Sequence, residues 1–467
     1  MNYFAHSDDV YQWLGNFINL ERGMGGRPGE HFKLDRMRRF ARLAGHPEKS
    51  APVIHVAGSK GKGSVTAMLA AILEKAGMKT ARYLSPHVSS WRERIGSAAG
   101  AFPEEIYTAA GNELREIYTA FRNGAEDPAE RGGAEEGEPT FFELATLYFF
   151  LCARAAGAEI MAVETGLGGR LDATNIVDPL ASVITLIETE HTEYLGNTPK
   201  EIAGEKAGII KRGRPLFLAE QTAEVFSLFR TKAAALGARL YYLGEHVETS
   251  GLAVRREGAA FSLLFHTGGL CGERVECRVP VPGKVYAANA ALAALTLTTL
   301  FPRRVNADSV RAGLESCALP ARFETLAEAP PVITDGAHTA ASVSSCADTF
   351  CGLYGEGGIL LFGCARDKNA SALAALLRGR FSRVIITAPG NFRAGDPPAV
   401  YKAFTRAEDL RPGRGGPDAV ELIPDTAEAI RRVIELRALT RLPVLGTGSF
   451  YLAAALRDAL PPAEDRT

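Results

Sequence analysis

The segment Gly58-Ser-Lys-Gly-Lys-Gly-Ser64 carries residue types that can hold phosphate groups. It follows the apolar run from Pro52 to Ala57, and apolar residues recur after it at helical spacing. Backbone N–H groups of a glycine turn at the start of a helix form a cradle for phosphate oxygens. Lys62 would reach the terminal phosphates of a nucleotide, and Ser64 could bind magnesium. The residues expected to contact the nucleotide in this turn are Gly58, Ser59, Gly61, Lys62, Gly63 and Ser64.

This segment departs from the strict phosphate-loop pattern G-x-x-x-x-G-K-[ST] at two places. Val56 occupies the first glycine position, and Gly63 separates Lys62 from Ser64. An ordinary glycine-rich turn between a strand and a helix is the alternative interpretation. The lysine and the serine inside the turn favour nucleotide binding over that alternative.

Polar side chains also follow other apolar runs where those runs end. Ser85-Pro-His87 comes after the run from Lys79 to Leu84, and Glu190-His191 comes after the run from Ala181 to Ile187. The carboxyl ends of parallel strands form the ligand-binding edge of open α/β sheets. Taken alone, however, Ser85-Pro-His87 indicates only a turn, and a lone loop histidine such as His191 is more often a surface residue.

Two Thr-x-x-Glu segments match the helix-capping box. Thr140-Phe-Phe-Glu143 precedes an apolar helical stretch, and Thr198-Pro-Lys-Glu201 begins a helix that carries Lys206. From these residues alone we favour a capping role for Thr140 and Glu143. A helical lysine such as Lys206 is usually a solvated charge.

The segment Glu164-Thr-Gly-Leu-Gly-Gly-Arg-Leu-Asp-Ala-Thr-Asn175 follows the apolar run from Ile160 to Val163. Its glycines allow the backbone to approach a ligand closely. A purely structural loop would rarely need so many polar side chains. The residues expected to contact a substrate here are Arg170, Asp172, Thr174 and Asn175.

The elements that must position these residues alternate between apolar runs and helical patterns. This alternation predicts a parallel, doubly wound sheet. The region from about Leu240 to Pro280 alternates in polarity and contains glycine turns, which predicts hairpins. A helix from Ala287 to Leu300 is then expected to close the first domain. The predicted strands are Pro52 to Ala57, Lys79 to Leu84, Ile160 to Val163 and Ala181 to Ile187.

A second alternation of strands and helices begins after Leu319-Pro320. A chain of 467 residues is too long for one ordinary core, so we expect two domains, 1–319 and 320–467. The first is an N-terminal P-loop-type domain with a doubly wound, mostly parallel sheet, and the second is a smaller Rossmann-like α/β domain. The predicted elements of the second are strands at Val332 to Thr334, Ile359 to Phe362, Val384 to Thr387 and Val444 to Leu445, with helices at Ser371 to Leu377 and Thr426 to Leu436. Between Arg122 and Pro139 the polar composition predicts a mobile surface insertion.

Composition excludes several classes of protein. The net charge of −1 provides no general field for binding nucleic acid or an anionic membrane. Seven cysteines without a C-x-x-C pair indicate reduced thiols rather than a disulfide framework or a zinc site. The stretch from Met1 to Leu20 lacks the features of a signal peptide, and no run approaches the ~20 apolar residues that span a bilayer. We therefore expect a soluble, cytoplasmic protein.

Together these motifs resemble the folylpolyglutamate synthase and dihydrofolate synthase family of the Mur ligase superfamily. The stretch from His55 to Ser64 is similar to the family's phosphate loop, with Ser59-Lys60 where Thr-Asn is usual. The stretch from Glu164 to Asn175 is similar almost residue for residue, and matches continue in order from about Phe17 to the last helix. Near the N-terminus this chain inserts Gly23 to His31. Other departures are Thr165 for Val, Glu190 for Asp, Ala321 for Gly and Thr339 for Asn.

The resemblance implies a set of residue roles. Lys62, His191 and Lys206 would take part in the reaction, and Lys206 would be carbamylated. The implied ligands of a pair of magnesium ions are Ser64, Ser85, Glu143, His191 and Lys206. The implied ATP contacts beyond the glycine turn are Asn289, Arg322, Asp335 and His338.

The resemblance also implies a reaction. The ATP γ-phosphate would pass to a substrate carboxylate, and the amine of L-glutamate would attack the resulting acyl phosphate. We expect folate polyglutamylation by a monomer, with dihydropteroate as a further acceptor in a dihydrofolate synthase reaction. The need for potassium stays open. The alternatives are a Mur-type ligase acting on a nucleotide-linked precursor, a nucleotide-dependent switch, and a silent nucleotide-binding homologue.

Overall fold

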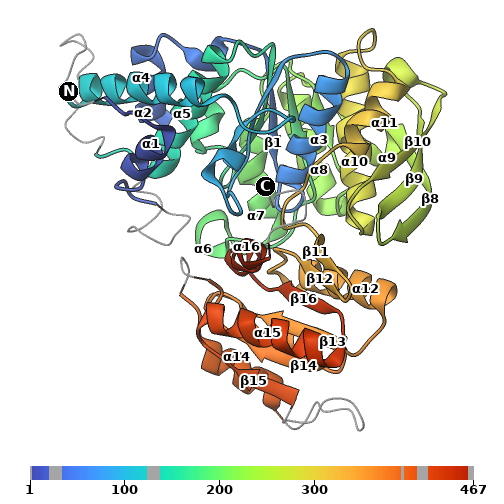
Figure 1. Cartoon of the computed structure of the whole chain (residues 1–467). Coiled ribbons are helices and arrows are strands. Elements are labelled where there is room, and N and C mark those ends of the chain that lie inside the picture. Colours follow the sequence, from blue (N-terminus) through green and yellow to red (C-terminus); the bar gives the residue numbers. More distant parts are fainter. Residues whose placement is uncertain (1–2, 20–33, 124–136, 391–393, 407–418, 461–467) are drawn as a thin grey trace.

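Two parallel-rich α/β sheets organise the chain, and a small antiparallel sheet lies beside the first (Figure 1). The structure, a computed structural model, describes residues 3–19, 34–123, 137–390, 394–406 and 419–460. The predicted insertions from Gly23 to His31 and, over 124–136, between Arg122 and Pro139 lie outside these residues. The fold class predicted from the sequence is confirmed.

The first sheet has seven strands in the order β3-β2-β4-β1-β5-β6-β7. β3 pairs antiparallel with β2, and all the other neighbouring strands of this sheet pair in parallel. β1 lies between β4 and β5 and is buried along its whole length, because helices cover both faces of a parallel sheet. The strands are β1 (Val53–Ala57), β2 (Thr80–Tyr83), β3 (Ile95–Gly96), β4 (Ile160–Glu164), β5 (Ala181–Ile184), β6 (Leu216–Leu218) and β7 (Leu240–Tyr242).

Helices on both sides of the first sheet hold the strand ends in place. The principal ones are α1 (Ser7–Leu14), α2 (Leu34–Leu43), α3 (Lys62–Lys75), α4 (Glu104–Arg122), α5 (Phe141–Ala155), α7 (Pro199–Lys206), α8 (Ala223–Ala235), α10 (Lys284–Leu300) and α11 (Ala307–Glu315). α10 and α11 both pack on α3. The sequence placed the end of this part of the fold at α10, and that prediction was wrong, because α11 follows and packs on the helix of the glycine turn.

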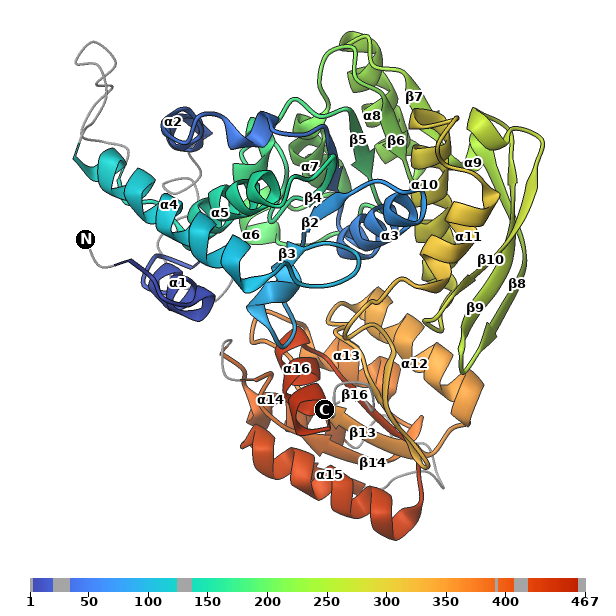
Figure 2. The same cartoon turned by 45° about the horizontal axis from the view of Figure 1, so that its top comes forward.

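The predicted hairpins are present as a three-stranded antiparallel sheet, β8 (Val247–Arg255), β9 (Gly258–Phe265) and β10 (Arg274–Val279). β10 alternates between exposed and buried residues, as expected for a sheet with one face on the core. Figure 2 shows this sheet at the edge of the molecule beside α10 and α11. The start of the predicted region differs, since β7 joins the large sheet instead.

The second sheet has six strands in the order β11-β12-β16-β13-β14-β15. The sequence predicted four of these strands but missed β11 and β15. β11 pairs antiparallel with β12, and β15 is only three residues long. Its strands are β11 (Glu324–Glu328), β12 (Pro331–Thr334), β13 (Gly358–Phe362), β14 (Phe381–Ile386), β15 (Val420–Leu422) and β16 (Val444–Thr447), and its helices are α12 (Ala340–Tyr354), α13 (Ala370–Leu377), α14 (Pro397–Thr405), α15 (Thr426–Thr440) and α16 (Phe450–Ala459).

Arg457 of α16 connects the two parts of the fold. Its Nε lies 3.0 Å from Glu324 Oε1 in β11, and its Nη1 lies 3.3 Å from Glu93 Oε1 next to the first sheet. Glu93 in turn accepts a 2.5 Å hydrogen bond from the backbone N–H of Val88. One arginine therefore ties the last helix to the loop that follows β2. Within the described residues, no helix combines the length and apolar character needed to cross a membrane.

The close packing of α11 on α3 leads to a stability prediction. A Cβ at Gly313 would lie 2.5 Å from Cα of Ile72, so Gly313→Ala should lower the free energy of unfolding by about 1–3 kcal/mol. A Cβ at Gly352 in α12 would meet nothing within 4 Å beyond the nearby backbone of its own helix, so Gly352→Ala should raise the free energy of unfolding by about 0.5–1 kcal/mol. Unfolding in guanidinium chloride measures both. Equal stability of the two variants would contradict the packing of α11.

Candidate functional site

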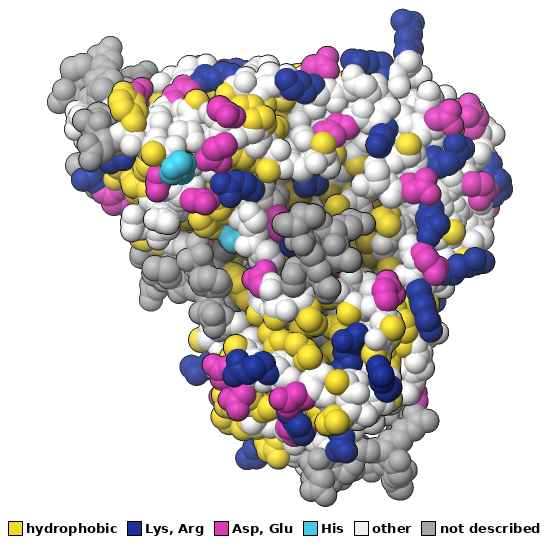
Figure 3. Space-filling model, in the orientation of Figure 1, with side chains coloured by type: hydrophobic (Ala, Val, Ile, Leu, Met, Phe, Trp, Pro, Cys, Tyr) yellow, Lys and Arg dark blue, Asp and Glu magenta, His cyan; other side chains and the backbone are white. Residues whose placement is uncertain are grey.

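A cavity of about 720 Å³ lies between the two large sheets. The glycine turn and the loops after β2, β4 and β5 line one side, and loops of the second sheet line the other. On the face in Figure 3, charges of both signs are interspersed. The predicted site residues that line the cavity are Ser59, Gly61, Lys62, Ser64, Ser85, Glu143, Asp172, His191, Asn289, Arg322, Asp335 and His338.

The glycine turn fits tightly against its neighbours. A Cβ at Gly58, which has φ 153°, would lie 1.7 Å from Thr185 Oγ1. A Cβ at Gly61, with φ 86°, would lie 2.6 Å from Asn289 Oδ1. Only glycine fits at these two positions, so the turn is held between β5 and α10 with its N–H groups at the start of α3. Asn289 thus lies against this glycine turn.

Glu164 ends β4 inside the cavity, and the sequence did not single it out. Its Oε2 accepts a 3.0 Å hydrogen bond from the backbone N–H of Ser85, and a Cβ at Gly63 would lie 3.3 Å from the same oxygen. Burial raises the pKa of Glu164 to about 7, although the charge of Lys62 acts in the opposite direction. An acidic residue at the end of a buried strand was the signal that could have identified it.

Glu143 is occupied in the way its capping motif indicates. Its Oε1 and Oε2 accept hydrogen bonds of 2.9 and 2.7 Å from the buried guanidinium of Arg36. Oε2 also accepts from the backbone N–H of Thr140 at 2.8 Å, which completes the capping box. Both oxygens of Glu143 therefore accept hydrogen bonds within the protein, while Glu143 also lines the cavity, and the metal role that the resemblance implied for it stays a prediction.

Lys206 and Glu190 form a buried ion pair behind the glycine turn. Lys206 Nζ lies 3.1 Å from Glu190 Oε1 and donates a 2.7 Å hydrogen bond to the backbone carbonyl of Gly58. Burial lowers the pKa of Lys206 to about 8, although Glu190 acts in the opposite direction. Burial alone would raise the pKa of Glu190, but the charges of Lys62, Lys206 and Lys60 lower it to about 2. Lys206 is therefore not the solvated helical charge that its spacing indicates.

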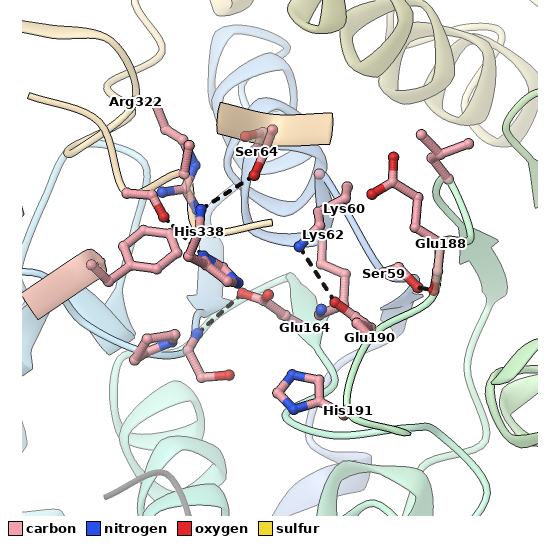
Figure 4. A pocket seen from close by; sticks show the side chains of 18 of the residues that line it. Ser59, Lys60, Lys62, Ser64, Glu164, Glu188, Glu190, His191, Arg322 and His338 are labelled. Carbon is pink, nitrogen blue, oxygen red and sulfur yellow. Dashed lines mark hydrogen bonds and ion pairs between the residues drawn. The ribbon is translucent and has the colours of Figure 1, made fainter. Parts of the chain in front are cut away.

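His191 and His338 approach the cavity from different parts of the fold, and Figure 4 shows His191 beside Glu190. Burial lowers the pKa of His191 to about 4 and that of His338 to about 3. Both imidazoles are thus neutral at pH 7, which is the form that can bind a metal. His338 Nδ1 lies 2.9 Å from the carbonyl oxygen of Gly336 and must donate to it, so Nε2 is the acceptor nitrogen.

Arg322 and Asp335 lie where the second sheet meets the cavity. Asp335 accepts hydrogen bonds from the backbone N–H groups of Ala337 at 2.7 Å and Phe323 at 2.8 Å. The Arg322 guanidinium lies 4.3 Å from the centre of the Phe450 ring. Ala321, which stands where the family has glycine, adopts φ 51°, a left-handed conformation that glycine adopts without strain.

The polar side chains of the loop from Glu164 to Asn175 bind the loop itself and the elements next to it. Asp172 lines the cavity but accepts hydrogen bonds from the backbone N–H groups of Leu167 and Thr174 at 2.9 and 3.0 Å. Asn175 Nδ2 donates to the carbonyl of Gly208 at 3.2 Å. The described lining of the cavity does not include Arg170, Thr174 or Asn175. Arg170 instead pairs with Glu205, and Thr174 Oγ1 lies 2.8 Å from His55 Nε2.

Comparison with known proteins identifies the family. The Mur ligase middle domain family matches residues 56–297, and the Mur ligase glutamate ligase domain family matches residues 321–450. A dihydrofolate synthase/folylpolyglutamate synthase of Bacillus subtilis (strain 168) is 34% identical over 364 residues, which are 77% of this chain and 80% of that protein. The chain belongs to the folylpolyglutamate and dihydrofolate synthase family of Mur ligases.

Other members of this synthase family match nearly the whole chain. The dihydrofolate synthase/folylpolyglutamate synthase of Mycobacterium tuberculosis (strain ATCC 25618 / H37Rv) is 31% identical over 452 residues, 91% of this chain and 89% of that protein. A crystal structure of Mycobacterium tuberculosis folylpolyglutamate synthase, complexed with ADP and AMPPCP, has a TM-score of 0.81 and 28% identity. The match covers 97% of this chain and 98% of that one.

The donor set in this synthase site suits magnesium better than a protein-caged metal. The described residues contain no group of three or more His, Cys, Asp and Glu side chains placed to share one ion. Magnesium usually keeps several waters and binds one or two carboxylates plus substrate phosphates. Buried Glu164, with the hydroxyl-bearing residues Ser64 and Ser85 lining the same cavity, fits that requirement.

Proposed function

We propose that this chain is an ATP- and magnesium-dependent ligase that adds L-glutamate to the carboxylate of a folate. The observation that carries the proposal is one cavity lined by the glycine turn, buried Glu164 and Glu190, with Lys206 paired to Glu190 behind the turn. The Mycobacterium tuberculosis relative complexed with ADP and AMPPCP supports the use of ATP. The names of the Bacillus subtilis and Mycobacterium tuberculosis relatives support both folates and dihydropteroate as acceptors.

Condensation of a carboxylate with an amine needs activation of the carboxylate. Transfer of the γ-phosphate from ATP to the carboxylate oxygen gives an acyl phosphate and ADP. The glutamate nitrogen then attacks the carbonyl carbon, and phosphate leaves with the carbon–oxygen bond electrons. The amide forms after the nitrogen loses its proton.

The residues of this chain would position and stabilise that reaction. Backbone N–H groups of the turn and the Lys62 ammonium would neutralise charge on the phosphates. Ser64, Ser85, Glu164 and His191 would hold magnesium, which supplies positive charge next to the transferring phosphate. We place Glu164 in this set in place of Glu143. Lys206, carbamylated, would be a further ligand, and its lowered pKa favours the neutral amine that reacts with carbon dioxide.

We propose that units 1–319 and 320–467 move relative to one another as substrates enter. The cavity lies between them, and Arg322, Asp335 and His338 come from the second unit. Closure would exclude water, which otherwise hydrolyses an acyl phosphate. We also propose that a single chain is sufficient, because residues of one chain line both sides of the cavity.

The test is product identification with purified protein, ATP and magnesium. Tetrahydrofolate and dihydropteroate are supplied separately, each with and without L-glutamate, and the products are identified by mass spectrometry. A gain of one or more glutamyl units is expected on tetrahydrofolate, and one unit on dihydropteroate if the protein carries both activities. A nucleotide-linked peptidoglycan precursor is supplied in a third reaction. Phosphate release without a glutamyl product on either folate acceptor, or product formation on that precursor alone, would reject the folate proposal.

A further inference from the structure

A guanidinium and an aromatic ring meet on the side of the cavity formed by the second sheet. The Cζ of Arg322 lies over the Phe450 ring, 4.3 Å from its centre, and Nη1 donates a 3.2 Å hydrogen bond to the carbonyl oxygen of Ala321. The charge of Arg322 acts on the carboxyl of Asp335, but both oxygens of that carboxyl accept hydrogen bonds from backbone N–H groups. The ring of Phe450 is therefore the side chain against which the guanidinium packs.

The Phe450 ring is itself held firmly in place. Phe450 is the first residue of α16, and Ser449 caps this helix by accepting a 3.1 Å hydrogen bond from the backbone N–H of Tyr451. Ser449 Oγ also donates a 2.8 Å hydrogen bond to the carbonyl oxygen of Pro389. On the other side of the ring, a Cβ at Gly336 would lie 2.5 Å from ring atoms Cδ1 and Cε1. The helix start and the loop after β12 thus fix the position of the ring.

The charge of Arg322 reaches the end of the cavity where the phosphates would bind. Arg322 and Phe450 line the same cavity as the glycine turn, and Figure 4 shows Arg322 and His338 on one side of it. Burial raises the pKa of Glu164 to about 7, and the charges of Lys62 and Arg322 act in the opposite direction. Glu164 lies against the glycine turn, so Arg322 is close enough to act on an anion bound there.

An aromatic face and a carboxylate orient a guanidinium with different consequences. A carboxylate partner would offset the positive charge and occupy N–H donors that a phosphate could use. A ring attracts the cation through its quadrupole but carries no net charge, and it contacts the face of the guanidinium rather than the edge that bears the N–H groups. The arrangement of Phe450 and Arg322 therefore keeps both the charge and the donors available to a phosphate.

We propose that Phe450 is a positioning residue for the nucleotide, whose ring face holds the Arg322 guanidinium toward the phosphates of magnesium-ATP. The inference rests on the proposed function for the identity of the nucleotide. Phe450 acts through Arg322, so its loss should raise the Kd and the KM for ATP while kcat at saturating ATP changes little. The KM for L-glutamate should stay unchanged.

The test weakens the attraction of the ring without removing the ring. Phe450 is replaced by mono-, di- and trifluorinated phenylalanine, because each fluorine draws electron density from the ring face while the shape changes little. Phe450→Leu removes the ring altogether. Calorimetry measures the affinity for magnesium-ATP, steady-state kinetics measure kcat and both KM values, and thermal unfolding shows whether each variant is folded.

Two controls separate a cation–π contact from ordinary packing. The same substitutions are made in an Arg322→Met background, where the cation is absent. Trifluorinated phenylalanine is also placed at Phe404, a buried residue of α14 whose ring lies 5.5 Å from that of Phe362. The described lining of the cavity does not include Phe404, so this variant shows what fluorination of the second domain does by itself.

The expected result is a graded loss of affinity that depends on Arg322. Phe450→Leu should weaken binding of magnesium-ATP by about 5–30-fold, and the affinity should fall stepwise with each added fluorine. In the Arg322→Met background the fluorinated variants should all bind alike. The protein with fluorinated Phe404 should bind as the wild type does.

Other outcomes would overturn the inference. They are an affinity that does not change with fluorination, an equal loss in the Arg322→Met background, and an equal loss from fluorination of Phe404. If the wild type forms no glutamyl product but its affinity for magnesium-ATP follows the expected series, the proposed function fails and this inference stands. If products form but fluorination has no effect, the inference alone fails, and a wild type that binds no magnesium-ATP contradicts both.

Discussion

Replacing Glu164 with glutamine is expected to lower kcat for glutamate addition by about 10²–10³-fold. Glutamine keeps the shape of the side chain and can still accept the 3.0 Å hydrogen bond from Ser85 N–H. It lacks the negative charge that would bind magnesium beside the transferring phosphate. Steady-state kinetics at saturating ATP measure kcat, and a magnesium titration should show the affinity for magnesium falling as well.

Glu143 provides the matched control for Glu164. Glu143→Ala leaves the buried guanidinium of Arg36 without its carboxylate, which typically costs about 3–5 kcal/mol of stability. The fraction that remains folded should keep a kcat much closer to that of the wild type than Glu164→Gln does. If Glu143→Gln proved stable but lost as much activity as Glu164→Gln, the role implied by family resemblance would be right and the proposal from the structure wrong.

The same Glu164→Gln variant should also change how stability depends on pH. The pKa of Glu164 is raised from 4.5 to about 7 in the fold, so the folded state holds a proton that the unfolded state loses. This contribution is fully present below pH 4.5 and is lost as pH rises through about 7. We therefore expect the free energy of unfolding of the metal-free wild type, relative to that of the variant, to fall by about 3 kcal/mol as the pH rises across that window. A flat difference would contradict the raised pKa.

Substitution of Lys206 is expected to lower activity by a similar factor, but also to lower stability. Lys206→Met removes both the group that would form a carbamate and the ammonium that pairs with buried Glu190. We expect a loss of kcat of about 10²–10³-fold and a loss of stability of about 3–5 kcal/mol. Unfolding in guanidinium chloride and steady-state kinetics measure the two effects separately.

Lys206→Arg separates the charge from the carbamate. Arginine keeps the positive charge beside Glu190, so much of the stability should return, but it stays protonated and cannot form a carbamate. The rate should therefore remain low. A carbamate signal from ¹³C-bicarbonate should appear in the ¹³C NMR spectrum of the wild type and be absent from both variants. Recovery of the rate in Lys206→Arg would show that the charge alone is required.

The sequence predicted those features that depend on neighbouring residues. Apolar runs predicted β1, β4 and β5 because a buried parallel strand needs apolar side chains on both faces. The capping boxes at Thr140 and Thr198 were predicted because a cap needs only four consecutive residues. The short strand β15 was missed, since its pairing with β14 depends on a distant partner. β11 was missed although its partner β12 follows it directly, because Glu324–Glu328 contains no apolar run.

Much of the site could not be predicted because it depends on the direction of side chains. Arg36 lies far from Glu143 in the chain, and no spacing rule connects them, so Glu143 could not be recognised as occupied. Thr174 and Asn175 carry polar groups as expected, but these turn toward the loop and its neighbours rather than the cavity. The helical pattern around Lys206 likewise did not predict its burial, which results from the packing of α7 behind the glycine turn.

The contact of Arg457 with Glu93 and Glu324 also bears on how the protein is made. During synthesis the glycine turn leaves the ribosome long before α16. Early segments can fold while later ones are still being synthesised. The nascent chain can therefore form the glycine turn long before Arg457 emerges to hold the loop after β2. Until then that turn is open to the solvent on the side later covered by the second sheet. Chaperones that meet the growing chain would find the nucleotide site exposed.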